Sequence, residues 1–461
     1  MAVVYTKKDQ GKTLSTGGGV PLHSAIAGDE YTDTTSGIHY VFTTSWAPLS
    51  TSTGGLTYFI ETGNTASPNT TVPVVALIAN SGVTNVDVSI VPKGTGSFML
   101  DIPDNTLNGG DKRGTESVDL QMSRNASTQV ASGQRSTLLG GWNSIASGSY
   151  SLANGLTNSA TNNYSIALGD NNTASGQWSL SVGFSNLANN NGAVALGYDN
   201  NATNAATVAL GDSNTASGSR SVALGQSNTA GGTNATAIGY LNTSNGFASA
   251  VIGYGNSTAY DGNYAFGYAN TLTSGPSGNN SNVFAFGIGN TVNASNAVAI
   301  GAYGLTNGVT SRQTFSGGRI TTNGDAQKST FFYRGRTTDA TLTTLATDGN
   351  NSINAGNCMQ LANNSAIRFK GTIIGKQSGS TNTVAWDIDG LIVRGSSAAS
   401  TSLVVGNVNL VSNIPAWGTP VISAYIDAFN GVGAMRIQIQ GASSTSIQWT
   451  AIIDTTEVIY A

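Results

Sequence analysis

Short apolar runs return at a constant interval through the middle of the chain. The pattern apolar-Ala-apolar-Gly recurs in steps that are mostly fourteen residues long. The third residue after the glycine is Asn in eleven of the twelve copies, and Gly304 stands there in the last copy. A fixed period of this kind is typical of solenoids, in which each repeat forms one coil of a stack. The marker glycines are Gly140, Gly155, Gly169, Gly183, Gly197, Gly211, Gly225, Gly239, Gly253, Gly267, Gly287 and Gly301.

The length of the repeat selects the kind of coil. Fourteen residues are too few for two helices, but they suffice for two short strands and two turns. We therefore expect a parallel β-solenoid over 135–304, with Gly304 in the coil that ends the stack. In one repeat, Val222 and Leu224 share a face of the strand and Ala223 takes the other. Because so small a coil buries few side chains, we expect other copies of the chain to cover the alanine face, as a homo-oligomer.

The recurring asparagine predicts a ladder along the solenoid. Glycine supplies backbone angles at the corner that other residues resist, and Asn tolerates the left-handed conformation better than most. Stacked coils place equivalent side chains ~4.8 Å apart, close enough for amide hydrogen bonds from coil to coil. The interior members of this structural ladder are Asn172, Asn186, Asn200, Asn214, Asn228, Asn242, Asn256 and Asn270.

Four further segments flank the repeat. Residues 1–55 lack periodicity and hold three lysines and three successive glycines, so we expect an arm that becomes ordered on a partner. Residues 56–134 are interpreted as a β-rich shoulder and 305–330 as a linker. In 331–461, apolar and polar residues alternate as in half-buried strands, which predicts an antiparallel β-sandwich tip. The predicted fold class is all-β.

Composition narrows the function classes. Only 9% of the residues are charged, 59 are glycine and the net charge is −4, which excludes a disordered polyelectrolyte and offers no basic face to nucleic acid. The longest apolar run, Val72–Ala79, is too short to cross a bilayer, so no membrane insertion is expected. Cys358 is the single cysteine, which excludes an intrachain disulfide and a zinc site built from thiolates.

Candidate catalytic carboxylates are sparse. Between residues 140 and 301 there is no Glu, and the four aspartates there are interpreted as turn residues. In the tip, Asp387 and Asp389 fall on one strand face and Glu457 lies near the end, which leaves a cleavage or ion site open as the less favoured reading. We predict no enzyme activity, cofactor or metal. The four aspartates of the repeat are Asp170, Asp199, Asp212 and Asp261.

Other chemical signals are weak. His23 and His39 are interpreted as ordinary residues rather than metal ligands. Gly11–Thr13 matches the end of a phosphate loop, but Thr6 stands where the first glycine of that motif belongs. We expect the aromatic residues of the tip to pack in a core rather than to stack on sugars. These aromatics are Trp386, Trp417, Tyr425 and Trp449.

The Val-Ala-Leu/Ile-Gly-x-x-Asn-Thr-Ala-x-Gly repeat over about 135–304 resembles the head repeat of trimeric autotransporter adhesins. The resemblance implies left-handed parallel β-rolls assembled as trimers. The signal peptide, coiled-coil stalk and membrane barrel of those adhesins are not expected in this chain, which counts against a cellular adhesin.

The flanks resemble fibre and appendage proteins of tailed bacteriophages, particularly those of cyanobacterial and marine hosts. The resemblance is spread over roughly 85–461, and the segments that carry it are 91–97, 102–114, 118–121, 131–133, 331–337, 369–375 and 447–458. It implies a structural virion fibre, assembled in the host cytoplasm, whose N-terminal arm docks on baseplate, tail or capsid proteins. Its tip would bind a glycan or protein of the host surface. The alternatives are a fibre whose tip degrades polysaccharide and a cellular trimeric adhesin.

Overall fold

The computed structural model describes residues 85–273, 282–414 and 417–460, together with the backbone of seven strands between residues 4 and 79. It divides into two compact units, Met1–Val91 and Pro92–Ala461. These units are coarser than the five segments expected from the sequence, whose boundaries stay predictions. In the described residues, every regular element is a strand except the 3-10 turn η1 (Ala398–Ser400).

The first unit contains two small sheets. Five strands form one sheet in chain order, with β2 parallel to β3 and the other neighbours antiparallel, and an antiparallel β6–β7 hairpin forms the second. His39 begins β4, whereas His23, Gly11 and most of the predicted arm lie outside the described residues. The strands are β1 (Val4–Asp9), β2 (Lys12–Gly17), β3 (Glu30–Asp33), β4 (His39–Phe42), β5 (Trp46–Pro48), β6 (Phe59–Asn64) and β7 (Val74–Ala79).

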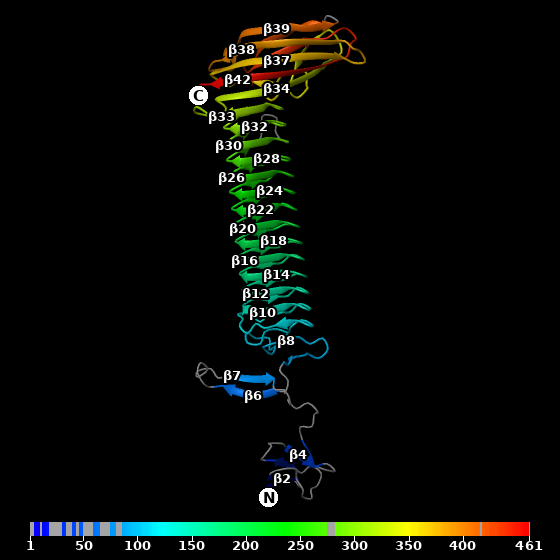
Figure 1. Cartoon of the computed structure of the whole chain (residues 1–461), viewed down its shortest axis with the longest axis vertical. Helices are drawn as coiled ribbons and strands as arrows, with labels where there is room; N and C mark the ends of the chain where they lie inside the picture. The colour runs from blue at the N-terminus through cyan, green and yellow to red at the C-terminus, as the bar shows by residue number, and fades with distance from the viewer. Residues whose placement is uncertain are drawn as a thin grey trace. The chain divides into compact units, whose positions relative to one another are not determined.

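The repeat folds into a parallel β-solenoid, which confirms the predicted architecture (Figure 1). Each coil has one longer and one two-residue strand, and equivalent strands pair in parallel so that the marker glycines from Gly155 onward face one another. The first marker is corrected by one residue, because a register shift places Gly141 rather than Gly140 opposite Gly155. The longer strands are β10 (Thr137–Trp142), β12 (Leu152–Leu156), β14 (Ile166–Asp170), β16 (Leu180–Phe184), β18 (Val194–Tyr198), β20 (Val208–Asp212), β22 (Val222–Gln226), β24 (Thr236–Tyr240), β26 (Ala250–Tyr254), β28 (Tyr264–Tyr268), β30 (Phe284–Ile288) and β32 (Val298–Ala302).

The two-residue strands stack into a second sheet behind the first. Residues 274–281, between β29 and β30, lie outside the described residues. The short strands are β11 (Ile145–Ala146), β13 (Ser159–Ala160), β15 (Thr173–Ala174), β17 (Leu187–Ala188), β19 (Asn201–Ala202), β21 (Thr215–Ala216), β23 (Thr229–Ala230), β25 (Thr243–Ser244), β27 (Ser257–Thr258), β29 (Thr271–Leu272) and β31 (Thr291–Val292).

The alanines point into the coil, and this corrects the expected packing. Ala223 is fully buried within its own coil, with Ala216 and Ala230 of the short strands, whereas Val222 and Leu224 on the opposite face are only half-buried. The space between the two sheets of a fourteen-residue coil is filled mainly by small side chains. The face that lacks a cover is therefore the outer one, which carries Val, Leu and Ile.

The backbone at the corners also differs from the expectation. Gly211 has φ +121°, as expected for a marker glycine, but Asn214 does not adopt the left-handed conformation. The residue before the asparagine does so instead: Ser213 has φ 56° and Ser227 has φ 54°. The asparagine is thus selected for its side chain rather than for its backbone.

The solenoid extends beyond both ends of the recognised repeat. At the start, β8 (Phe98–Met99) and β9 (Val118–Asp119) pair in parallel and lead into β10. At the other end, β33 (Gln313–Gly317) pairs in parallel with β32, so the coil of Gly304 does not end the stack. The segment expected as a linker therefore contains a strand of the same sheet.

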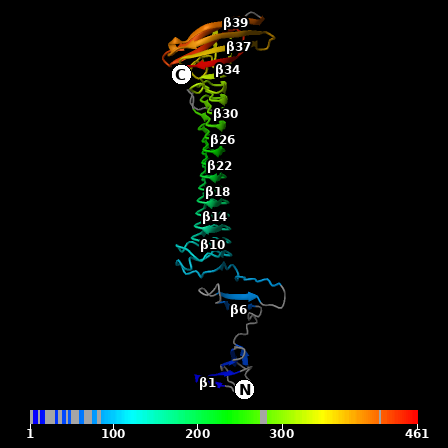
Figure 2. The same ribbon diagram turned by 60° about the vertical axis from the view of Figure 1, so that its left-hand side comes forward.

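The C-terminal region confirms the expected antiparallel sheet, and it joins the solenoid without a break. The start of β34 (Ala326–Thr337) pairs with β33, and β34 continues into a five-stranded antiparallel sheet in the order β34-β42-β37-β38-β39. Figure 2 shows these strands crossing the end of the coil column. The remaining strands of this sheet are β37 (Ser365–Gln377), β38 (Thr383–Arg394), β39 (Ser402–Ile414) and β42 (Ile447–Ile459).

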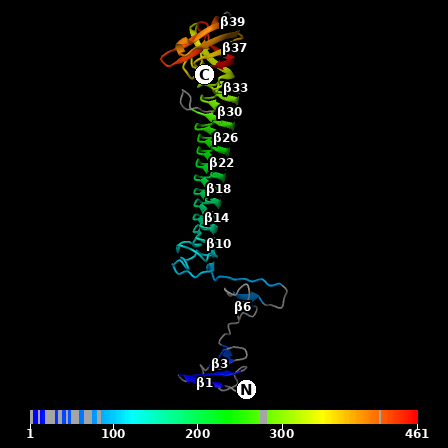
Figure 3. The ribbon, with the colours of Figure 1, turned by 90° about the vertical axis from the view of Figure 1, so that its left-hand side faces the viewer.

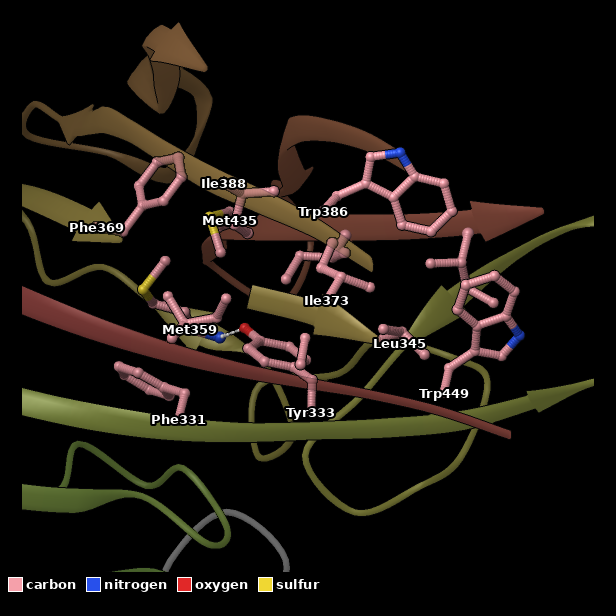
Figure 4. Close-up of a cluster of buried hydrophobic side chains, with 14 of the residues drawn as sticks. Phe331, Tyr333, Leu345, Met359, Phe369, Ile373, Trp386, Ile388, Met435 and Trp449 are labelled. Atoms are coloured by element: carbon pink, nitrogen blue, oxygen red, sulfur yellow. Dashed lines mark hydrogen bonds between the residues drawn. The ribbon is translucent and has the colours of Figure 1, made fainter. Parts of the chain in front are cut away.

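A second sheet covers one face of the first. It has the order β35-β41-β36, with β40 also paired to β41. Large apolar side chains of both sheets form the core, and the Tyr333 hydroxyl accepts a hydrogen bond from the Met359 backbone N–H at 2.6 Å (Figure 4). Its strands are β35 (Leu342–Leu345), β36 (Met359–Gln360), β40 (Gly418–Asp427) and β41 (Val432–Gln440).

Candidate functional site

The ladder asparagines are buried and bonded from coil to coil. Asn214 donates from Nδ2 to Asn200 Oδ1 at 3.0 Å, and its own Oδ1 accepts from the backbone N–H and Nδ2 of Asn228, both at 3.0 Å. Its Nδ2 also lies 3.0 Å from the Leu210 carbonyl and 2.6 Å from the Gly225 carbonyl. One side chain therefore ties three successive coils together, and the other interior members of the ladder repeat these contacts.

The two ends of the ladder are closed differently. At the start, the backbone N–H of Asn158 donates to Ser144 Oγ, so Ser144 rather than Asn143 precedes the ladder, and Asn143 Oδ1 has no partner in the described structure. At the far end, the Gly304 backbone N–H donates to Asn290 Oδ1 at 2.9 Å. The shift at the start follows from the first step of the repeat, which is fifteen residues long.

The aspartates of the repeat lie at strand ends and turns. Asp170 and Asp212 end β14 and β20, and the Asp212 carboxylate accepts hydrogen bonds from Ser213 and from Gln226. Asp261 accepts from the Phe247 backbone N–H at 2.8 Å, and Asp199 occupies a left-handed turn position. In the described residues, no hydrogen bond joins any two of the four, so they do not assemble a carboxylate pair.

Asp387 and Asp389 share a hollow on the outer face of the five-stranded sheet. The hollow has a volume of about 900 Å³ and is also lined by Asp454, Arg368 and Lys370. Asp389 pairs with Arg368 at 2.8 Å, and the hydrogen bond from this guanidinium, helped by Asn407, lowers the pKa of Asp389. Asp387 accepts from the Thr372 hydroxyl at 2.9 Å. We call this surface the mixed hollow because it carries both signs of charge.

Glu457 does not join the other two tip carboxylates. It is buried and forms an ion pair with Arg312, which directly precedes β33 at the end of the solenoid. Gln327 and Thr455 donate further hydrogen bonds to this carboxylate. The pair fastens the last strand of the chain to the coil stack, so its role is structural.

The remaining sequence candidates lie in packed surroundings. Trp386 and Trp449 stack in the core with ring centroids 6.2 Å apart, Trp417 packs on Trp449, and Tyr425 is partly buried beside Cys358. Burial raises the pKa of the Cys358 thiol to about 12, which leaves it protonated and unreactive at neutral pH. In the described part of the chain, no three His, Cys, Asp or Glu side chains come together as a metal site.

Two surface features were not found by sequence reasoning. Aromatic side chains stack along the solenoid in register: Tyr150 on Tyr164 at 5.1 Å, and Tyr254 on Tyr268 at 4.9 Å. A second hollow on the tip is lined by Arg334, Arg336 and Lys376. The alternation of Arg334 and Arg336 in one strand was a usable signal, because residues two apart share a face.

The middle of the chain is similar to a known family of repeats. The YadA head domain repeat matches residues 146–172, 160–186, 174–200, 188–214, 202–228, 216–242 and 284–303. These findings support an adhesin-like or fibre-like protein. A search of curated proteins gives no match.

A solved structure with partial likeness is a tailspike protein, gp49 from Acinetobacter baumannii bacteriophage Fri1, a capsular polysaccharide depolymerase. The sequence identity is 8%, the TM-score is 0.21, and the likeness covers 87% of this chain and 75% of the tailspike chain. A TM-score this low does not indicate a shared fold, so no conclusion about this chain rests on the likeness. No helix in the described residues is long and apolar enough to cross a membrane.

Proposed function

We propose that this chain is a structural fibre of a bacteriophage virion that binds the host surface through its C-terminal sheets. The observation that carries the proposal is the continuous sheet from the adhesin-type repeat into the tip: β32, β33 and β34 are hydrogen-bonded neighbours. A stack of uniform coils is a rigid spacer, and the sheet at its end offers an exposed outer face with two hollows. Virion proteins would hold the N-terminal arm.

The fibre is proposed to be a homotrimer. YadA-type repeats imply trimeric assembly, and the half-exposed outer face of the solenoid supplies the apolar surface that such an assembly would bury. Leu210 and Ile252 keep 36% and 37% of their surface exposed in the single chain, at equivalent places three coils apart. A periodic apolar stripe of this kind matches the same stripe on an identical rod.

Adsorption tests this function. Purified full-length protein, labelled and mixed with the bacteria that the phage infects, is expected to bind their surface and to slow infection when added in excess. A matched preparation unfolded by heat is expected to do neither. If folded protein neither binds the cells nor delays infection, the proposed function is wrong.

A second candidate is a tip that cleaves polysaccharide. It rests on the mixed hollow, where Asp387, Asp389 and Asp454 line one surface. The lowered pKa of Asp389 suits a nucleophile or base and not a general acid. This activity would be established by a release of reducing ends from host polysaccharide that is abolished by Asp387→Asn. If the parent releases no reducing ends, only the binding function remains as a proposal.

A further inference from the structure

A hollow on the tip gathers three positive charges around a neutral floor. It has a volume of about 600 Å³ and lies on the outer face of β34, β42 and β37. Strand register places Arg336, Gln448 and Lys376 in one row across the sheet and Arg334, Thr450 and Ile374 in the next. Arg336 and Lys376 therefore stand on either side of β42, with backbones ~10 Å apart. We call this surface the cationic hollow.

The three cations have no carboxylate partner in the described structure. Arg334 donates to the Asp348 backbone carbonyl at 3.2 Å, Arg336 to Ser446 Oγ at 3.1 Å, and Lys376 to the Ser380 carbonyl. In contrast, Lys328 and Arg368 elsewhere on the same face pair with Asp454 and Asp389. The positive charge of the cationic hollow is therefore uncompensated, in a chain whose net charge is −4.

The floor of the hollow offers hydrogen bonds and a small apolar surface. The Gln448 side chain is exposed and makes no hydrogen bond within the described residues. The Thr450 hydroxyl donates to the Tyr333 backbone carbonyl at 3.2 Å and keeps its acceptor capacity for a ligand. Ile374 is 42% exposed. A ligand with one face of hydroxyl groups and some C–H surface suits such a floor, because amide and hydroxyl groups both donate and accept.

The hollow stands away from the coil stack. β33 pairs only with Lys328–Thr330 of β34, so Arg334 and Arg336 lie four to six residues farther along the strand, ~13–20 Å from that pairing. Figure 1 and Figure 3 show the tip strands reaching past the side of the column. A ligand therefore has access to the hollow without meeting the solenoid.

We propose that the cationic hollow binds a carboxylated oligosaccharide, an inference that rests on the proposed function of the tip in host binding. Arg and Lys side chains recognise carboxylates, and Arg does so with two parallel hydrogen bonds. Three separate cations across ~10 Å match single charges on successive sugar rings better than one compact phosphate. The volume is that of a small-ligand site. A long polyanion such as nucleic acid would continue into the mixed hollow and meet Asp387, Asp389 and Asp454.

Titration calorimetry on the full-length protein tests the site. Trigalacturonate is expected to bind, more tightly at low ionic strength, whereas the neutral trisaccharide maltotriose is not. The double variant Arg336→Gln/Lys376→Gln is expected to weaken trigalacturonate binding by about tenfold or more. The matched control, Lys112→Gln/Arg220→Gln, removes one Lys and one Arg outside the tip and is expected to bind as the parent does.

Three results would overturn the inference. These are equal binding by the parent and the Arg336→Gln/Lys376→Gln variant, equal binding of maltotriose, and displacement of trigalacturonate by inorganic phosphate at the same concentration. If the double variant does not fold, the single change Lys376→Gln at an exposed strand end gives the same comparison. Adhesion to bacteria that persists in the double variant refutes this site alone, whereas a parent that binds trigalacturonate but no bacteria refutes the proposed function alone.

Discussion

At the residue scale, the ladder asparagines supply contacts between coils that a larger apolar core would otherwise supply. A coil lined by alanine has little apolar surface to bury, so much of its specificity comes from amides that bond three coils at once. Each amide also donates a hydrogen bond to the corner carbonyl of the marker glycine in the next coil.

Replacement of one ladder amide should destabilise the stack. Asn214→Leu removes the acceptor of Asn228 and the donor to Gly225, and each chain should lose ~1–3 kcal/mol or more in free energy of unfolding. Asn189→Leu is the matched control, because Asn189 is exposed and its side chain makes no hydrogen bond in the described structure. Urea unfolding at fixed protein concentration measures both. Equal midpoints would show that the ladder contributes nothing to stability.

A second residue-scale expectation concerns acid. Asp325 precedes β34, and although burial acts to raise its pKa, hydrogen bonds from the backbone N–H groups of Thr321, Ile320 and Thr322 prevail and hold the pKa at about 2. Because this value lies below the ordinary 3.8, the ionised group favours the folded state above about pH 4, and that stabilisation is lost as the pH falls to about 2.

Asp325→Asn tests this account. The amide brings a donor toward three N–H donors, so the variant should unfold at lower urea than the parent near neutral pH. The gap between the two midpoints should narrow as the pH falls from about 4 to about 2. If the difference between the two urea midpoints stays constant over this pH range, the charge of Asp325 is not the cause of that difference.

At the element scale, the marker glycines set how closely the coils approach. A Cβ atom on Gly211 would lie 2.0 Å from the Gly225 carbonyl oxygen, and the φ of +121° is itself unfavourable for other residues. Gly211→Ala should therefore cost at least ~2–3 kcal/mol. Gly255→Ala is the control: its φ is +62° and nothing lies within 4 Å of the added carbon, so the cost should be ~1 kcal/mol. Similar losses for both would refute close coil contact as the reason for the glycine.

The period of the repeat was enough to predict strands, coil size and register, because each of these depends on neighbours fourteen residues away. It was not enough to tell which face of the strand is inside: alternation separates Ala223 from Val222 and Leu224 but does not say which side the coil closes on. The end of the stack was also missed, since β33 carries Phe315 and Thr314 in place of the repeat motif.

In the candidate site, the sequence predicted which residues of one strand share a face, but it did not predict contacts between distant strands. Asp387 and Asp389 share a face because they are two apart in one strand, and that was predictable. The partner of Glu457 is Arg312, 145 residues away, and only the pairing of β42 with β34 and β37 brings the final strand beside the solenoid. Single-strand alternation contains no information on such strand order.

At the scale of the whole molecule, the outer face of the solenoid links fold and function. It continues from Ile300 through Phe315 to Lys328, so the apolar stripe of the coils gives way to a charged surface where the tip begins. An assembly that packs through the coils would bury the apolar stripe and would not involve the charged surface of the tip. The same sheet can therefore serve association over one length and ligand binding over the next.

The trimer is tested by a charge placed on this stripe. Leu224→Glu puts a carboxylate on the half-buried outer face, where a single chain tolerates it in contact with water but a packed interface does not. Native mass measurement should give three chains for the parent and mainly single chains for the variant, with unchanged β-sheet circular dichroism. Asn189→Glu adds the same charge at an exposed position of the solenoid whose side chain makes no hydrogen bond in the described structure, and it should remain a trimer. A parent protein that stays folded as single chains at micromolar concentration, or a Leu224→Glu variant that still forms trimers, would show that the stripe is not the interface.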